Sequence, residues 1–295
     1  MTAEMREVRL PEVPTLGSLY AQALGRMAQT VMTTRQPTTL PAVRYAVDDV
    51  AADRDQLAEY QHLLGEPGTD VLPAGYVHVL AFPVAVAVMA RADFPLPLLG
   101  MVHLANDVEQ RAPLRLGDRL AVRAWAEDLR LHRAGTQVDL VTEVDRDGET
   151  VWRGVSTYLA KGRTVAGAAA AEPGERDVPA LPPVAGQWRL RPDVGRRYAA
   201  VSGDRNPIHT SALGAKLFGF PRAIAHGMYT AARALATVGV ARGDAFRWTV
   251  EFGKPVLLPG TVTFGLGARA TGGHDYAGWD ARSGKRYLTG AVTPL

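Results

Sequence analysis

The sequence predicts an α+β protein built from two similar halves, each with a long central helix and a curved antiparallel sheet. Two observations carry this prediction. Each half has one long apolar segment compatible with a helix, followed by several stretches that alternate as strands do. The halves also share a spaced motif, which supports an internal duplication: Val108-Glu109, Pro113 and Gly117 in the first, and Val250-Glu251, Pro255 and Gly260 in the second.

The predicted elements follow in chain order. Residues 15–34 are expected to form an N-terminal helical extension, and residues 52–65 an amphipathic helix. The first half then has its long helix at 75–91 and strands at 101–111, 118–128, 135–145 and 150–160. The second half has its long helix at 227–241 and strands at 246–254, 261–269, 275–281 and 285–293. Asp145-Arg-Asp-Gly148 is a good hairpin signal between two of these strands.

One break in composition divides the chain. Residues 162–186 are rich in Ala, Gly and Pro and have no sustained hydrophobic period, which is typical of a linker. The sequence therefore predicts an N-terminal extension at 1–42, an N-terminal half at 43–161, the linker at 162–186 and a C-terminal half at 187–295.

Composition excludes several classes of function. The 295 residues contain 47% apolar and 21% charged residues, as in ordinary globular proteins, and no cysteine, which excludes disulfides, thiolate nucleophiles and cysteine-held metals. The arginines are scattered, so a nucleic-acid partner is not expected. The seven histidines lack metal-binding spacing, and Gly265-Leu-Gly267 runs into a turn, so neither a metal nor a cofactor is expected. Without a membrane-length apolar stretch or a signal-like start, a cytoplasmic location is expected.

The chemistry is concentrated in one stretch, Tyr198-Ala-Ala-Val-Ser-Gly-Asp-Arg-Asn-Pro-Ile-His209. One interpretation is purely structural: Gly, Asp, Asn and Pro form turns, and Asn206 would cap a helix that begins at Pro207. The other interpretation is catalytic, because Asp204 and His209 meet if the chain between them turns. The residues alone leave the two interpretations equally weighted.

This run, with Ala215 six residues further on, resembles the hydratase-2 motif of MaoC-like dehydratases. These are (R)-specific enoyl-CoA hydratases and 3-hydroxyacyl-thioester dehydratases with the hotdog fold, in which an antiparallel sheet wraps a long helix. The resemblance is strong over residues 190–260. Members of that family work either as dimers of single hotdogs or as double hotdogs in one chain, and the duplicated halves and linker of this sequence suit the second type. The resemblance implies a hydro-lyase of fatty acid metabolism.

The resemblance also implies roles for single residues. Asp204 and His209 match the catalytic pair, which would hold one water and exchange protons with substrate. Asn206 would orient the water or the pair. Gly227, in Ala225-His226-Gly227-Met228, would direct its N–H at the thioester oxygen from a helix N-terminus. Candidate substrate-binding residues are Ser202, His226, Met228, Arg205 and Arg222, although packing and hydrogen bonding are favoured over catalysis for the His226 side chain.

The N-terminal half has no Gly-Asp-x-Asn-Pro-x-x-His in its matching region and is expected to be catalytically silent. The runs 82–89 and 94–99 would either line an acyl channel or pack in the core. The expected partner is an acyl-CoA or acyl-carrier-protein thioester, and the chain would act as a monomer or a homodimer of double hotdogs. Two alternatives stay open at this point: a hotdog acyl thioesterase, and a non-catalytic acyl-binding scaffold.

Overall fold

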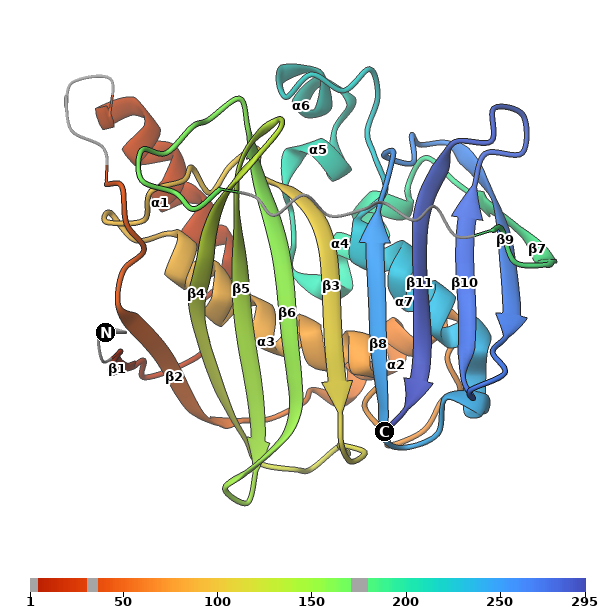
Figure 1. Ribbon diagram of the computed structural model, residues 1–295. Helices are drawn as coiled ribbons and strands as arrows, with labels where there is room; N and C mark the ends of the chain where they lie inside the picture. The colour runs from red at the N-terminus through yellow and green to blue at the C-terminus, as the bar shows by residue number, and fades with distance from the viewer. Residues whose placement is uncertain (1–4, 31–36, 171–179) are drawn as a thin grey trace.

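Eleven strands form one continuous sheet in the part of the chain that the computed structural model describes, residues 5–30, 37–170 and 180–295 (Figure 1). The strands are β1 (Arg6–Arg9), β2 (Val43–Val50), β3 (Val102–Gln110), β4 (Leu120–His132), β5 (Gly135–Arg146), β6 (Glu149–Lys161), β7 (Val184–Leu190), β8 (Phe246–Phe252), β9 (Gly260–Ala268), β10 (His274–Trp279) and β11 (Arg286–Pro294).

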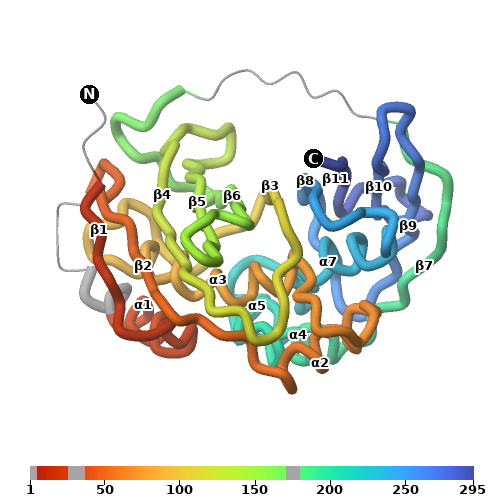
Figure 2. The backbone as a smooth tube through the Cα atoms, turned by 90° about the horizontal axis from the view of Figure 1, so that it is seen from below, coloured from red at the N-terminus to blue at the C-terminus, as the bar shows by residue number. Residues whose placement is uncertain are grey.

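The helices gather on one side of this sheet, as two perpendicular views show (Figures 1 and 2). They are α1 (Leu16–Thr30), α2 (Arg54–Leu64), α3 (Ala74–Met89), α4 (Val194–Ser202), α5 (Pro207–Thr210), α6 (Ala212–Leu217) and α7 (Gly227–Val238), with a 3₁₀ turn η1 at Gly239–Arg242. Within the described ranges, no helix has both the length and the apolar character needed to cross a membrane.

The strand order is symmetric. It runs β2-β4-β5-β6-β3 through the first half and then β8-β11-β10-β9-β7 through the second, with β1 added outside β2. In each half the second strand in sequence, β3 or β8, lies at the centre of the sheet, and the first strand, β2 or β7, lies outermost in that half. This shared order supports the internal duplication that the repeated motif predicts.

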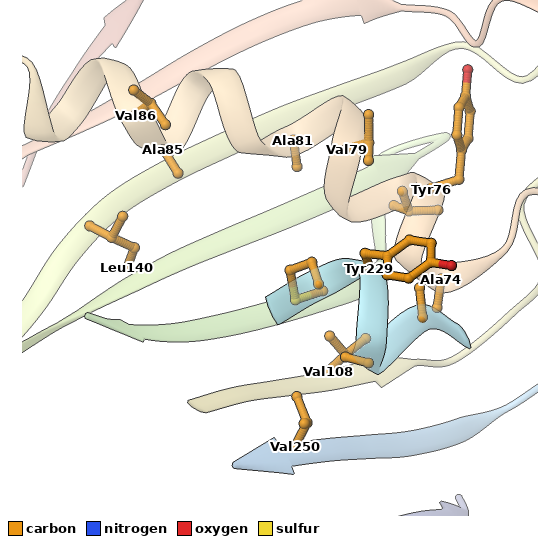
Figure 3. Packing of buried hydrophobic residues seen from close by; sticks show 14 of the residues in the cluster. Ala74, Tyr76, Val79, Ala81, Ala85, Val86, Val108, Leu140, Tyr229 and Val250 are labelled. Atoms are coloured by element: carbon orange, nitrogen blue, oxygen red, sulfur yellow. The ribbon is translucent and has the colours of Figure 1, made fainter. Parts of the chain in front are cut away.

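The two halves join where β3 and β8 pair antiparallel at the centre of the sheet. The pairing is symmetric about Asp107 and Thr249: Val108 lies opposite Trp248, and Val250 lies opposite Asn106. Val108 and Val250 are both fully buried, and Figure 3 shows them side by side, directed at the helices. The valines of the repeated motif thus occupy equivalent places at the junction.

The two long helices cross closely beneath the sheet. Helix α3 is apolar on all faces and almost completely buried, as expected of a central helix. Gly75 lies near its start, and a side-chain carbon there would collide with the Tyr60 hydroxyl and touch Ala232 of α7. Glycine therefore permits the close approach of α3 to α7.

The structure confirms the two long helices and the eight strands predicted for the two halves, with ends shifted by up to four residues. It adds β1, β2 and β7, and the helices α4 and α6. Strand β7 begins at Val184, inside the stretch predicted to be a linker, and residues 171–179 of that stretch lie outside the described residues. Helix α1 covers 16–30 of the predicted 15–34, and residues 31–34 are also outside the described ranges.

Candidate active site

The stretch from Ser202 to His209 forms a tight reversal between two helices. Helix α4 ends at Ser202, and Gly203 follows with a φ of 74°, a left-handed conformation that glycine adopts without strain. Asn206 then caps the single turn of α5 by accepting the Ile208 N–H at 3.3 Å, with Pro207 in the first position. The capping interpretation is therefore correct, and the reversal also places Asp204 and His209 on one cavity.

Asp204 lies at the centre of a set of hydrogen-bond donors. Its Oδ1 accepts the Tyr20 hydroxyl at 2.8 Å and the Asn206 N–H at 3.2 Å, and its own N–H donates to Ser202 Oγ at 3.2 Å. Burial acts to raise the pKa of this carboxyl. The neighbouring His226 and His209 imidazoles, with the Tyr20 and Asn206 donors, outweigh burial and hold the pKa below its ordinary value. Asp204 is therefore a carboxylate at neutral pH.

His209 has a fixed tautomer. Its Nδ1 lies 2.9 Å from the Ile224 carbonyl oxygen, which can only accept, so Nδ1 carries the hydrogen. The other ring nitrogen, Nε2, then holds a lone pair. Burial lowers the pKa of His209 and outweighs the Asp204 charge and the Ile224 carbonyl, which raise it. A neutral imidazole with a free Nε2 lone pair can accept a proton.

His226 is packed against both members of this pair. It is 3% exposed, its ring stacks on that of His209 with centroids 3.7 Å apart, and its Nε2–H donates to the Asp204 backbone oxygen at 3.0 Å. Burial, and then the neighbouring His209, lower the pKa of His226 to about 3. A side chain that stays neutral and donates to a backbone oxygen fits positioning rather than proton transfer.

These three residues are also the only described group whose donors could converge on a metal ion. A carboxylate oxygen and one nitrogen from each ring, from Asp204, His209 and His226, lie within 4.8 Å of one another. Two of the four ring nitrogens face carbonyl oxygens and carry hydrogens, which leaves His209 Nε2 and His226 Nδ1 as lone-pair donors. The absence of a metal in the working enzyme stays a prediction.

Helix α7 directs its N-terminus at the same cavity. It begins at Gly227, and no side chain caps it, so first-turn N–H groups are left without intrahelical partners. A side-chain carbon at Gly227 would approach the Phe252 ring to 3.1 Å. Glycine therefore leaves room between α7 and Phe252, and Gly227 lines the cavity at the positive end of the helix dipole.

The cavity beside these residues has a volume of about 840 Å³, within the range of small-molecule sites. Both halves line it. The N-terminal half supplies His78, Phe82 and Met89 from α3, with His103, Tyr158 and Lys161 from the sheet. The C-terminal half supplies residues of the stretch from Ser202 to His209, with Phe252 and Lys254. A site with walls from both halves requires the two halves in one assembly.

The cavity lining can be compared with the residues predicted from sequence. It includes Asp204, His209, Asn206, Gly227, Ser202, His226 and Met228. Arg205 and Arg222 are exposed and not among the lining residues, and the Arg222 guanidinium lies 3.5 Å from the Pro259 carbonyl oxygen. Of the runs 82–89 and 94–99, Phe82, Met89 and Leu98 line the cavity, whereas Phe94 and Leu96 pack in the core.

Sequence reasoning missed several lining residues. Tyr20 comes from the N-terminal extension and contacts Asp204 directly. Lys161 and Lys254, two of the four lysines, also line the cavity, as do His78, His103 and Tyr158. A buried His78 within an otherwise apolar helix was the one sequence signal that could have pointed to a polar patch here.

The chain is similar to known dehydratases. A family model described as a MaoC like domain matches residues 175–271. The 3-hydroxyacyl-thioester dehydratase X of Mycobacterium tuberculosis is 40% identical over 256 residues, which are 87% of this chain and 91% of that protein. A crystal structure of HtdX from the same organism has a TM-score of 0.76 at 37% identity, over 85% of this chain and 100% of the other.

A more distant structure supports the fold alone. The MaoC-like dehydratase of Phytophthora capsici has a TM-score of 0.66 at 20% identity, over 85% of this chain and 95% of the other. Together these similarities confirm the predicted α+β, double-hotdog fold.

Proposed function

Because the chain belongs to the MaoC-like dehydratase family, we propose that it dehydrates (R)-3-hydroxyacyl thioesters to trans-2-enoyl thioesters and catalyses the reverse hydration. The observation that carries the proposal is the facing pair of an ionised Asp204 and a neutral His209 within 4.8 Å, on one cavity. This separation suits one water, or one substrate hydroxyl, hydrogen-bonded to both groups.

In the hydration direction, the pair holds a water between an Asp204 oxygen and His209 Nε2. As the water oxygen attacks C3, a proton passes from the water to the pair, and C2 takes up a proton from the pair. In dehydration the pair removes the C2 proton, the C3–O bond breaks, and the hydroxyl leaves with that proton as water. The enzyme returns to its starting protonation state in both directions.

The N-terminus of α7 would stabilise the charge that develops on the thioester oxygen. When C2 gains or loses its proton, negative charge accumulates on that oxygen as in an enolate. The Gly227 N–H, uncapped and at the positive end of the helix, is a preorganised donor for it. Asn206 contributes by capping α5 and by donating its N–H to Asp204.

The N-terminal half would shape the acyl channel without doing chemistry. It lacks the Gly-Asp-x-Asn-Pro-x-x-His pattern, yet Phe82, Met89 and Tyr158 line the cavity. Arg205 and Arg222, expected from the sequence to bind substrate, do not line the cavity. Lys161 and Lys254 line it and are better placed to meet the phosphates of CoA or of a carrier protein. A monomer or homodimer in the cytoplasm stays the expected state.

A spectroscopic assay tests the proposal. Purified protein is mixed with crotonyl-CoA and with longer trans-2-enoyl-CoAs, and the loss of enoyl absorbance is followed. Hydration at one or more chain lengths supports the proposal. Release of free thiol instead would indicate a thioesterase. If folded protein gives neither signal, the result would favour a non-catalytic scaffold.

A further inference from the structure

Helix α1 lies outside the two symmetric halves but packs onto the catalytic stretch. Its buried residues, Leu16, Leu19 and Ala23, recur at helical spacing and form one apolar face. A side-chain carbon built on Gly203, the residue before Asp204, would contact Leu16 at 3.5 Å. The extension is thus fixed beside the catalytic carboxylate by its own core contacts.

Tyr20 adjoins this apolar face and reaches the carboxylate. Its hydroxyl donates to Asp204 Oδ1 at 2.8 Å, and the side chain lines the cavity. Burial, and then the negative charge of Asp204, raise the pKa of the phenol far above its ordinary value. The hydroxyl therefore stays protonated and acts only as a donor toward the carboxylate.

Both donors act on the same oxygen of Asp204. Oδ1 accepts the Tyr20 hydroxyl and the Asn206 N–H, whereas Oδ2 has the His226 Nε2 at 3.7 Å, beyond hydrogen-bond distance. Two donors from two different elements fix the rotation of the carboxylate about its side-chain bonds. Oδ2 is left to hold the reacting water or hydroxyl.

We propose that Tyr20 is a positioning residue, which orients the Asp204 carboxylate and keeps it ionised for proton transfer at Oδ2. The N-terminal extension then completes an active site whose catalytic groups all come from the C-terminal half. This inference rests on the proposed function for its effect on turnover, but the effect of Tyr20 on the carboxylate exists whatever the substrate.

The test compares Tyr20→Phe with Tyr45→Phe. Tyr45 is the matched control because its hydroxyl also has a side-chain hydrogen bond, accepted from the Arg91 guanidinium at 3.0 Å, and it does not line the cavity. The Asp204 carboxyl is titrated by ¹³C NMR and assigned with Asp204→Asn. The pH profile of kcat/KM for enoyl-CoA hydration is measured on the same proteins.

Removal of the Tyr20 hydroxyl should raise the Asp204 pKa in the NMR titration and steepen the acid limb of the pH profile, because protonation of His209 and of Asp204 both contribute to that limb. It should lower kcat about tenfold with little change in KM, because a hydrogen bond to a charged group is lost. Tyr45→Phe should behave as wild type. An unchanged Asp204 titration in Tyr20→Phe would overturn the inference. A raised Asp204 pKa in a protein inert to every enoyl-CoA would uphold it and instead refute the proposed function.

Discussion

The Gly227 amide can be tested by a pair of substitutions, one that keeps the backbone N–H and one that removes it. Gly227→Ala adds a side-chain carbon 3.1 Å from the Phe252 ring and keeps the N–H. Gly227→Pro adds the same carbon and two further ring carbons, and it removes the N–H. Proline is well tolerated here because Gly227 is the first residue of α7, and His226 before it has φ −60° and ψ 136°, which a following proline requires.

The expected difference follows from the loss of one donor to the developing oxyanion. Losses of this kind lower kcat by about 10²–10³-fold, or roughly 2.7–4 kcal/mol of transition-state stabilisation. Gly227→Ala should lose much less than Gly227→Pro, since the ring of Phe252 needs to move by only a few tenths of an ångström. The free energy of unfolding of Gly227→Ala should change little, because the preference of helices for alanine over glycine, about 1 kcal/mol, offsets the close contact with Phe252.

The assay is steady-state hydration of crotonyl-CoA, with kcat and KM resolved and folding checked by thermal unfolding. The effect of removing the Gly227 N–H should appear in kcat, because this donor acts on charge that exists only in the transition state. Equal kcat values for the Ala and Pro variants would refute the assignment of Gly227 as the donor. A loss confined to KM would indicate that the added atoms only obstruct substrate.

Three further results are expected. Burial lowers the pKa of His209, so the acid limb of the pH–rate profile should be centred below 6.5, the ordinary pKa of histidine, with a plateau at higher pH. A limb centred above 6.5 would contradict a neutral His209 base. Glu66→Ala should lower the free energy of unfolding by about 3–5 kcal/mol in chemical denaturation, because the Glu66 side chain is 3% exposed and pairs at 3.0 Å with Arg242 across the two halves. Asp70→Ala, which removes an exposed ion pair, should lower it by less than about 1 kcal/mol. Equal losses would show that burial of the Glu66–Arg242 pair does not matter. Phe82→Trp should lower kcat/KM for long enoyl-CoAs relative to crotonyl-CoA, since the larger ring narrows the cavity, and parallel losses at all chain lengths would place Phe82 outside the acyl channel.

Local signals made most of the fold predictable from sequence. Helix α3 is a long apolar run, and the strands of both halves alternate between turns such as Asp147-Gly148, whose residues have positive φ. Two of the three strands that were missed, β2 and β7, lack this regularity. Strand β2 has an irregular burial pattern, with two exposed aspartates before its last residue, and β7 is a short, mostly exposed edge strand containing Gly186.

The same distinction between local and distant information applies to the site. Asp204, Asn206 and His209 lie within one turn of chain, so their meeting could be predicted from spacing and turn residues. Tyr20 is 184 positions from Asp204, and only the docking of α1 brings it there. Arg205 is next to Asp204 in sequence but exposed, because adjacent residues at a chain reversal point in different directions.

Hydration of crotonyl-CoA by wild type, Asp204→Asn and His209→Ala tests the central claim most directly. Exposed residues of α2 supply the matched controls Asp55→Asn and His62→Ala. We predict that wild type and both controls remove the enoyl absorbance at similar rates, and that each catalytic variant loses about 10²-fold or more in kcat while its unfolding temperature stays near that of wild type. Catalytic variants that are folded and as active as wild type would contradict the assignment of proton transfer to Asp204 and His209.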